Sequence, residues 1–559
     1  MRKKSENASY IHQTQVQQSY SEKKTLLEHS CQLNIDLTPG YVRQTSIVCT
    51  LGDSWANLEC LENMILNGAN IFRLNMTLNT KEFYEKIIKI VREIEAKYTW
   101  NPCVAIAVDL TAPTVRTGMI HGSMDAAVTL KEGALVTLTS NDEYKMKSNE
   151  SVIFIDLRFF PKFLDSLLPA DKIFLDDGGV HLEVINVVDD KVNCKVILPG
   201  ELGSLKRLQL THNRAFSAHQ IEAYYNDLEW AKSQNVDMVF TSMDETMDRV
   251  KKAKEILGSD IALLPKIETR LGVSNFADII SCSDGIIINR GTLGTEYSQE
   301  KIFKLQKSLI ARCMVAKKPV FVIHQLLESM CFKPRATRAE VCDVGNAVLD
   351  GADGLILGVE TARGDFPLQC LQVMHKTCRE AEGAIFHEHL QRELKNAQDA
   401  IHFGHSSVPV NIQKSVTDCT VATTALAAVE AAFNIHATAI LVPTISGRSA
   451  QEIASYRPSC PVVAIVRRPE VARRLHLYRG VHPYVFTGDK EADWASDMDL
   501  RLNSALEKIR ERGFVSTGDI VVCVNGWNPF SGTTNTVRMI PVPEKGVSVP
   551  VLCQAVSQT

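Results

Sequence analysis

Short apolar runs recur along the chain, and a stretch with a helical pattern follows each of them. The runs cover residues 47–50, 71–75, 104–109, 238–242, 261–266, 285–289, 320–324 and 355–358. Uninterrupted Val, Ile and Leu is typical of parallel strands that are buried on both faces. Helical patterns between the runs include residues 81–97, 243–257, 301–316 and 338–349. Eight strand–helix units in succession predict a (β/α)8 TIM barrel, an α/β fold.

The third strand–helix unit is interrupted by a segment of different texture, from about Pro113 to about Phe216. Its strand-like runs cover residues 128–130, 135–139, 152–157, 173–175, 181–184 and 195–198. Turn residues, such as Asp-Asp-Gly-Gly at 176–179, separate these runs. The pattern predicts a β-barrel domain that is inserted into a barrel loop.

A third region begins beyond Phe386, where a charged helical stretch at residues 388–395 leads into alternating strands and helices. The expected strands cover residues 439–442, 462–466, 484–487 and 520–524, and they predict a separate C-terminal α/β domain. The chain therefore divides into a polar tail and lead-in (1–40), the barrel (41–112 and 218–386), the inserted β domain (113–217), the α/β domain (387–543) and a tail (544–559).

Length and composition favour a multidomain globular protein over a nucleic-acid-binding or membrane-spanning one. A chain of 559 residues is too long for one core, which agrees with several domains. A formal net charge of −4 gives no electrostatic reason to expect nucleic acid or an anionic membrane as partner. No apolar stretch approaches the roughly 20 residues of a membrane span. The 15 Cys lack paired CxxC spacing, which is typical of reduced thiols in a cytoplasmic protein.

Candidate chemistry gathers at the ends of the predicted strands, where a barrel of this kind places its active site. Lys266 and Glu268 stand two residues apart, so on an extended strand they point to the same side. Arg73 and Arg116 present planar guanidinium groups that suit phosphate oxygens. Oxygen-bearing side chains that suit a hard cation stand at the same ends, namely Asn75, Thr77 and Asp109.

These segments resemble the pyruvate kinase family. The resemblance extends from about Thr45 to Pro543, and its most specific stretches are residues 71–75, 266–268, 328–340 and 346–353. It implies phosphoryl transfer from phosphoenolpyruvate to ADP, which yields pyruvate and ATP, with Mg²⁺ or Mn²⁺ and K⁺ as cofactors. It also implies a homotetramer in the cytoplasm.

The resemblance implies a role for each matching residue. Lys266 would stabilise charge on the phosphoryl group in flight, and Glu268 would bind the divalent metal together with position 292. The substrate would contact Arg73, Lys266, His324 and the amides of Gly291 and Thr292. The nucleotide would contact Arg73, Asn75 and Lys206. Potassium would be held by Asn75, Thr77, Asp109 and the carbonyl of Leu110.

Five departures from the family pattern fall around the same mouth. Thr292 stands where the family has the metal-binding Asp, and His324 where it has the catalytic Thr. Leu78 replaces a His, Thr111 a Lys, and Gly358-Val359 a Ser-Gly pair. The Thr292 hydroxyl and the Asn289 amide would offer only neutral oxygens to the metal.

Two interpretations of these departures stay open. The chain is either a pyruvate-kinase-type phosphotransferase with reduced activity, or a non-catalytic relative that binds ligand or co-assembles with an active paralogue. His324 is either a titrating group that replaces a proton donor or a hydrogen-bonded residue at a strand end.

A second candidate site lies in the C-terminal domain. A segment that opens a helix after a strand supplies Thr444, Ser446, Gly447, Arg448 and Ser449. Amides and hydroxyls at a helix N-terminus bind phosphate well. With Trp494 and Arg501, the segment resembles the family's sugar-bisphosphate effector site. The nearby turn departs from the family, because Asn528 and Phe530 replace Arg and Gly.

Overall fold

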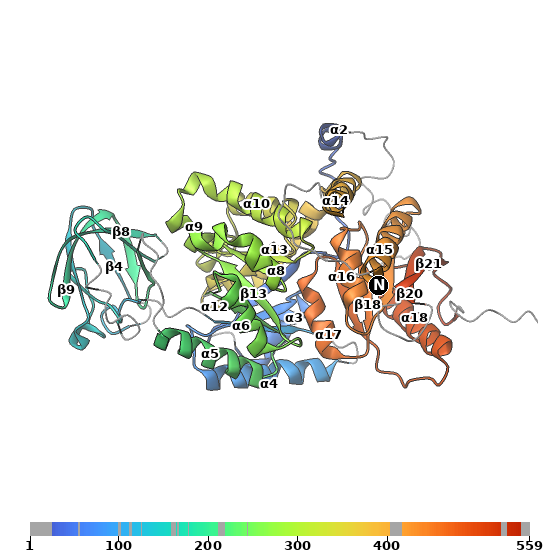
Figure 1. Ribbon diagram of the computed structural model, residues 1–559, viewed down its shortest axis with the longest axis horizontal. Coiled ribbons are helices and arrows are strands. Elements are labelled where there is room, and N and C mark those ends of the chain that lie inside the picture. Colours follow the sequence, from blue (N-terminus) through green and yellow to red (C-terminus); the bar gives the residue numbers. More distant parts are fainter. Residues whose placement is uncertain are drawn as a thin grey trace, which may run out of the picture.

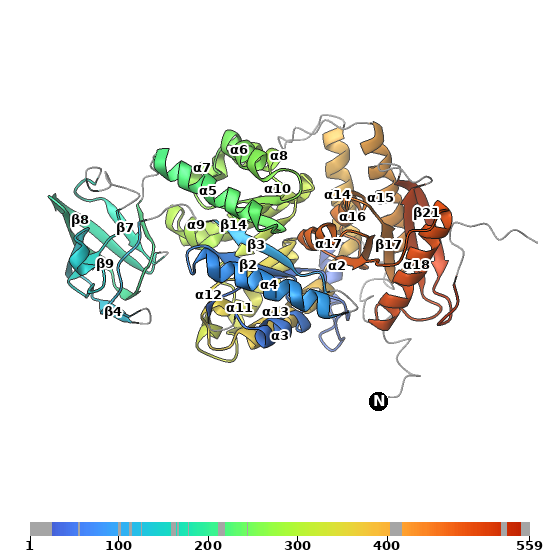
Figure 2. The ribbon, with the colours of Figure 1, turned by 90° about the horizontal axis from the view of Figure 1, so that it is seen from below.

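Three bodies follow one another along the long axis of the computed structural model (Figure 1). The structure describes residues 25–53, 56–98, 102–110, 115–123, 126–157, 164, 167–176, 178–210, 218–242, 244–402, 416–526 and 534–548. A β domain occupies one end, a barrel the middle and an α/β domain the other end, and the perpendicular view agrees (Figure 2). None of the helices in these ranges has the length and apolar content that crossing a bilayer requires.

Eight parallel strands close into a barrel in the order β1-β16-β15-β14-β13-β12-β3-β2. They are β1 (Ser46–Thr50), β2 (Ile71–Asn75), β3 (Ala105–Asp109), β12 (Met238–Thr241), β13 (Ala262–Ile267), β14 (Ile286–Asn289), β15 (Val320–Ile323) and β16 (Gly354–Leu357). Each of the eight apolar runs forms one of these strands. The predicted (β/α)8 barrel is therefore confirmed.

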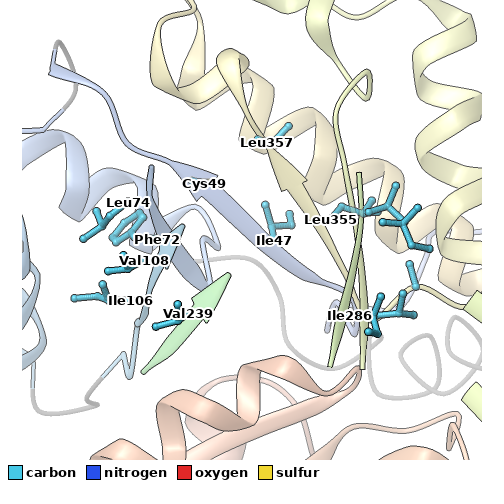
Figure 3. Packing of buried hydrophobic residues seen from close by; sticks show 14 of the residues in the cluster. Ile47, Cys49, Phe72, Leu74, Ile106, Val108, Val239, Ile286, Leu355 and Leu357 are labelled. Atoms are coloured by element: carbon cyan, nitrogen blue, oxygen red, sulfur yellow. The ribbon is translucent and has the colours of Figure 1, made fainter. Parts of the chain in front are cut away.

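Neighbouring residues of each barrel strand pack into different cores, because successive side chains of a strand point to opposite faces. Ile47 and Cys49 pack outward, in the large cluster that strands and helices share (Figure 3). Val48 and Phe321 belong to the cluster that fills the barrel. Leu477 of the α/β domain joins this inner cluster, so that domain contributes to the barrel's core.

Helices surround the barrel. They are α3 (Leu58–Leu66), α4 (Lys81–Lys97), α5 (Ala218–Ser233), α6 (Met247–Leu257), α7 (Arg270–Ser274), α8 (Phe276–Cys282), α9 (Arg290–Glu296), α10 (Ile302–Val315), α11 (Arg338–Leu349), α12 (Val359–Ala362) and α13 (Pro367–Gly383). Helix α11 has the predicted bounds and begins with a capping box between Thr337 and Glu340. Helix α6 begins four residues later than predicted, because Thr246 has an extended backbone and is its N-cap.

The inserted domain forms a six-stranded sheet, β11-β7-β8-β9-β5-β6, and a two-stranded sheet, β10-β4. Its strands are β4 (Ala127–Leu130), β5 (Leu135–Thr139), β6 (Val152–Phe154), β7 (Lys172–Leu175), β8 (Val180–Val188), β9 (Lys191–Leu198), β10 (Gly200–Gly203) and β11 (Leu208–Leu210). One hydrophobic cluster unites both sheets. The sequence did not predict β10 and β11, because strands of three or four residues, one with Gly at both ends, leave no apolar run.

The α/β domain has a five-stranded sheet in the order β19-β18-β17-β20-β21, with the last strand antiparallel. The strands are β17 (Ala439–Pro443), β18 (Val462–Val466), β19 (Val481–Val485), β20 (Ile520–Gly526) and β21 (Thr534–Pro541), and the helices are α14 (His387–His402), α15 (Val416–Asn434), α16 (Arg448–Ser455), α17 (Pro469–Arg474) and α18 (Trp494–Glu511). The predicted C-terminal α/β domain is confirmed. Strand β19 begins three residues before the predicted run, because its buried residues alternate with partly exposed ones.

Two ion pairs attach the α/β domain to the barrel at residues that immediately precede strands. Arg457 binds both oxygens of Asp353, at 2.7 and 2.8 Å, next to the start of β16. The Nε atom of Arg473 lies 2.6 Å from Oδ1 of Asp237, next to the start of β12. The domain therefore meets the barrel at the amino ends of its strands. The carboxyl ends, where the candidate chemistry gathers, lie at the opposite mouth.

Candidate active site

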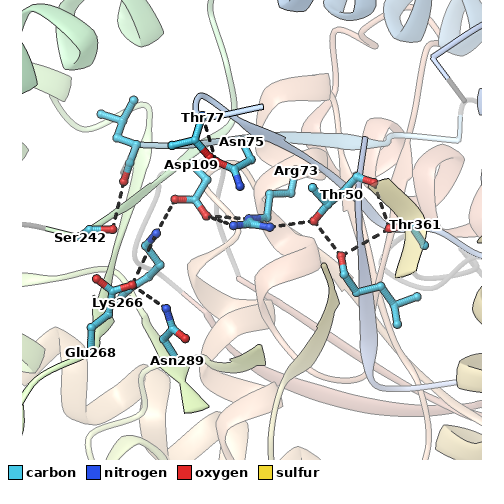
Figure 4. Close-up of polar contacts among 12 residues, drawn as sticks. Thr50, Arg73, Asn75, Thr77, Asp109, Ser242, Lys266, Glu268, Asn289 and Thr361 are labelled. Atoms are coloured by element: carbon cyan, nitrogen blue, oxygen red, sulfur yellow. Dashed lines mark hydrogen bonds and ion pairs between the residues drawn. The ribbon is translucent and has the colours of Figure 1, made fainter. Parts of the chain in front are cut away.

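A buried carboxylate joins two cations at the carboxyl ends of the strands (Figure 4). Asp109 ends β3, and its side chain is fully buried. Its Oδ2 accepts a hydrogen bond from Nε of Arg73 at 2.6 Å, and its Oδ1 one from Nζ of Lys266 at 2.6 Å. Burial alone would raise the pKa of Asp109, but the Arg73 guanidinium and the Lys266 ammonium hold it below its ordinary value. The pairs fix Arg73 and Lys266 in the mouth.

Lys266 and Glu268 lie on the same side of β13 and its end, as their spacing predicts. Nζ of Lys266 is 3.8 Å from Oε1 of Glu268. The same Oε1 accepts a hydrogen bond from Nδ2 of Asn289 at 2.6 Å. The Oδ1 of Asn289 in turn accepts from the amide of Thr292 at 3.3 Å, because Asn289 is the N-cap of α9. In this structure the cap turns the nitrogen of Asn289, rather than its oxygen, towards Glu268.

Thr292 and His324 lie on two sides of Gly291. The Thr292 hydroxyl is buried, and it accepts a hydrogen bond from Arg207 of the inserted domain at 3.1 Å. A Cβ atom on Gly291 would lie 3.4 Å from Cβ and Cγ of His324, so the His324 side chain packs against this glycine. The His324 backbone has a φ of +74°, and its carbonyl accepts from Arg290. These contacts hold α9 against the end of β15.

Oxygen atoms at the ends of β2 and β3 form the candidate potassium site. The Oδ1 of Asn75 accepts from the amide and the hydroxyl of Thr77, at 3.2 and 2.9 Å. The carbonyl of Leu110 accepts from the Ser242 hydroxyl at 3.3 Å. With Asp109, whose two oxygens accept from Arg73 and Lys266, these residues provide one carboxylate and several neutral oxygens, the ligand types that a hard cation takes. Ser242 was not predicted, because it reaches the site from another strand.

The residues at Glu268 do not fit a divalent ion in the same way. Mg²⁺ requires oxygen acceptors around it. Here the Glu268 oxygen faces the Asn289 amino group, and the Thr292 oxygen faces a guanidinium. Across the described ranges, no group of three or more His, Cys, Asp or Glu side chains is arranged to hold a metal. In this structure a donor therefore occupies Oε1 of Glu268 and another occupies the Thr292 hydroxyl.

Comparisons with known proteins decide the family. The family model of the pyruvate kinase barrel domain matches residues 42–371, and that of the pyruvate kinase alpha/beta domain matches residues 422–540. The chain belongs to the pyruvate kinase family. Pyruvate kinase PKLR of Homo sapiens is 38% identical over 525 residues, which cover 93% of this chain and 88% of that protein. The pyruvate kinase of Candida albicans is 36% identical over 513 residues, with 91% and 97% covered.

Departures from the pyruvate kinase pattern are neighbours in space. His324 packs against Gly291, which precedes Thr292, and a Cβ atom on Gly358 would lie 3.9 Å from Nδ1 of His324. The Leu78 amide donates to the carbonyl of Asn75, so this departure adjoins the candidate potassium site. Thr111 lies outside the described residues. The departures at positions 292, 324 and 358 are thus neighbours at the ends of three adjacent strands, β14, β15 and β16.

The candidate nucleotide contact Lys206 belongs to the inserted domain. Its Nζ lies 2.8 Å from Asp176 Oδ2, which holds it within that domain. Arg207, the next residue, reaches instead to Thr292. Consecutive residues of an extended segment point to opposite sides, so Lys206 contacts Asp176 while Arg207 contacts Thr292. The sequence did not single out Arg207, although it stands next to Lys206, a candidate nucleotide contact.

The candidate effector residues gather at the carboxyl edge of the C-terminal sheet. Thr444 follows β17, and its hydroxyl accepts from the amide of Gly447, the left-handed N-cap of α16. Ser449 hydrogen-bonds Thr534 of β21 at 2.7 Å. Arg448 and Ser446 are exposed at the same turn, and Trp494 begins α18. Asn528 and Phe530 lie outside the described residues.

An ion-pair network connects Arg501 to this edge. Asp497 binds Arg501 at 2.5 Å and Arg467 at 2.6 Å. Arg467 follows β18 immediately, and the Thr444 amide donates to Ile465 of that strand at 2.9 Å. Arg467 and Arg501 therefore lie near the Thr444 turn. This arrangement adds Arg467, which the sequence did not single out, to the cations near the turn.

Proposed function

We propose that this chain is a pyruvate-kinase-type phosphotransferase whose chemical step is slow. The observation that carries the proposal is the position of Lys266, whose side chain is only 3% exposed and whose Nζ is fixed by Asp109 at the barrel mouth. A preorganised ammonium of this kind stabilises negative charge as a phosphoryl group moves between two acceptors. Arg73, held by the same carboxylate, would bind the transferred phosphate or the nucleotide.

The slow rate follows from position 292. Replacing one of two carboxylates of a metal site by a hydroxyl removes charge that the bound ion requires. A loss of roughly 3–5 kcal/mol of transition-state stabilisation lowers the rate by about 10²–10⁴-fold. The proposed reaction, phosphoenolpyruvate and ADP to pyruvate and ATP, therefore proceeds well below the rate of an active family member.

The proposed cofactor set includes K⁺, held by Asn75, Thr77, Asp109 and the Leu110 carbonyl. Bound there, K⁺ would add positive charge at the mouth that an anionic substrate enters. Lys206 would serve the nucleotide after leaving Asp176. The cysteines of the described ranges are free thiols, which supports a reducing compartment such as the cytoplasm.

The proposal extends to assembly and regulation. We expect a homotetramer, the usual assembly of this family, with the symmetry that closed oligomers adopt. Light scattering at micromolar concentration tests this, and a monodisperse monomer contradicts it. Co-purification of differently tagged chains tests hetero-assembly with an active paralogue. The Thr444 turn, Trp494 and Arg501 would bind a sugar bisphosphate.

A non-catalytic role is the second candidate, and the contact between Thr292 and Arg207 favours it. The guanidinium lies at the hydroxyl that replaces the metal-binding carboxylate. In that case the chain would bind ligand, or join an active paralogue, without turnover.

Pyruvate formation by the purified protein, with Mg²⁺, Mn²⁺ and K⁺ supplied, separates the two candidates. The phosphotransferase proposal expects slow turnover that Lys266→Met abolishes. Lys89→Met is the matched control, because Lys89 is exposed on α4, and it should leave the rate unchanged. Turnover that is absent from the wild type, or that survives Lys266→Met, contradicts the phosphotransferase proposal.

A further inference from the structure

Two hydrogen-bond donors of this chain face the residues that would hold the divalent ion. We infer that the mouth binds a phosphorylated carboxylate without a divalent cation, with the Arg207 guanidinium and the Asn289 amide in the place of the ion. The inference rests on the proposed function for its ligand class, a small molecule that carries phosphate and carboxylate groups. It concerns how that ligand is held.

The orientation of Asn289 is determined by its two neighbours. The Thr292 amide can only donate, so it requires the side-chain oxygen of Asn289. The Oε1 atom of Glu268 accepts a hydrogen bond from the side-chain nitrogen. Both hydrogen bonds require the same orientation of the Asn289 amide, and exchanging its oxygen and nitrogen would break both. Asn289 thus occupies one oxygen of Glu268, the residue that would hold the ion, with a hydrogen bond.

Arg207 supplies the second donor and a full positive charge. Its guanidinium donates to Thr292 at 3.1 Å, from the segment that enters β11 of the inserted domain. Its Nε atom is buried and has no hydrogen-bond partner. A buried N–H without a partner is costly, and an anion in the mouth would provide one. The planar guanidinium fork can donate to two oxygens of a phosphate or a carboxylate at once.

The charged residues connected at the mouth carry a net positive charge even when no metal ion is bound. Arg73, Lys266 and Arg207 are cations, and Asp109 and Glu268 are anions, so these five linked residues carry a net charge of +1. Glu296 lies near Arg207 but has its own cation in Arg270, at 3.9 Å. An Asp at position 292 would make the network neutral until a metal bound. With Thr292, the mouth attracts an anion directly.

Calorimetric titration with phosphoenolpyruvate tests the inference on the intact protein. In buffer with K⁺, the dissociation constant should agree within about threefold between EDTA and Mg²⁺. Arg207→Met should weaken binding in EDTA at least tenfold. Lys195→Met, which removes an exposed cation of the same domain, should leave it unchanged. Binding that requires Mg²⁺, or no binding in either buffer, overturns the inference.

The free Mn²⁺ signal in electron paramagnetic resonance provides a readout that is independent of activity. The wild type should leave millimolar Mn²⁺ essentially free. Asn289→Asp adds a carboxylate beside Glu268 and should raise Mn²⁺ affinity at least tenfold. If Asn289→Asp fails to fold, as judged by its thermal transition, the wild-type titration alone decides. Tight Mn²⁺ binding by the wild type overturns the inference.

The outcomes separate this inference from the proposed activity. If phosphoenolpyruvate binds in EDTA but no pyruvate forms, the inference is supported and the phosphotransferase proposal fails. If phosphoenolpyruvate binds only when Mg²⁺ is present and pyruvate then forms, the phosphotransferase proposal is supported and the inference fails.

Discussion

The side-chain nitrogen of Asn289 lies 2.6 Å from a carboxylate oxygen of Glu268. The same side chain caps the Thr292 amide, so one residue contacts both positions that would hold a divalent metal. Lys266 and Asp109 keep their pairing a few residues away. The mouth therefore places the cation that we propose to stabilise the phosphoryl group beside an altered position for the proposed metal.

Asp109→Asn should strongly destabilise the fold, because it leaves the buried charges of Arg73 and Lys266 without their partner. Breaking a buried pair by removing one member costs roughly 3–5 kcal/mol. Urea denaturation at pH 7 measures the difference. Glu183→Gln, at a partly exposed carboxylate of β8, is the control and should change stability by less than about 1 kcal/mol. A cost below 1 kcal/mol for Asp109→Asn would contradict the argument.

The pH dependence of stability should contain the contribution of Asp109. Its pKa is lower in the folded protein than in the unfolded chain, where the ordinary value is about 3.9. The unfolded state then binds more protons as the solution is acidified, so this stabilisation is present above the unfolded pKa and is lost as pH falls towards the folded pKa. Asp109→Asn should show a shallower loss of stability in that acid range. Parallel curves for the two proteins would disagree with this assignment.

Arg457→Ala should loosen the attachment of the α/β domain to the barrel. It removes two hydrogen bonds to Asp353 and leaves that buried carboxylate with weaker partners, a cost of roughly 3–5 kcal/mol. The exposed pair of Lys508 and Glu511 gives the control, since Lys508→Ala should cost less than about 1 kcal/mol. Equal thermal transitions for the two variants would show that the Asp353 contact is not a main attachment.

Arg501→Ala should abolish the stabilisation that a sugar bisphosphate gives the wild type. A ligand that binds only the folded state raises the thermal transition by mass action, and the loss of one guanidinium removes a charge-assisted contact to phosphate. Differential scanning fluorimetry with and without fructose 1,6-bisphosphate measures the shift. An unchanged shift in Arg501→Ala would place the ligand elsewhere.

The sequence predicted those features that depend on local patterns. Strand β2 and helix α11 have the expected bounds, because an apolar run or a capping box marks their ends. Lys266 and Glu268 share a side because the period of a strand is two. In contrast, β21 forms only as an antiparallel partner of β20, and its mostly exposed residues leave no apolar run.

The contacts that the sequence did not predict join residues that are far apart in the chain. Arg207 reaches Thr292 across 85 positions of the chain, from one domain to another. Within the barrel, Ser242 donates to the Leu110 carbonyl across 132 positions of the chain. The nitrogen of Asn289, rather than its oxygen, faces Glu268 because α9 begins at that residue, and the start of that short helix was not predicted.

Restoring the metal position should require more than one change. Thr292→Asp places a carboxylate next to the Arg207 guanidinium, so the two should pair and limit the gain in Mg²⁺-dependent rate to less than about tenfold. Adding Arg207→Met and Asn289→Ala should raise the rate by more than the sum of the separate effects, because the three residues are in contact. Thr295→Asp, one turn along α9, is the control and should give no gain.

The impaired metal position is tested by pyruvate formation with saturating Mg²⁺ and K⁺ in the wild type and in the Thr292→Asp/Arg207→Met/Asn289→Ala variant. We expect a wild-type kcat about 10²–10⁴-fold below that of an active family member and at least a tenfold recovery in the triple variant. Lys266→Met should remove the recovered rate. A wild type that turns over like an ordinary pyruvate kinase, with no gain in the triple variant, would contradict the claim that this mouth is impaired at its metal position.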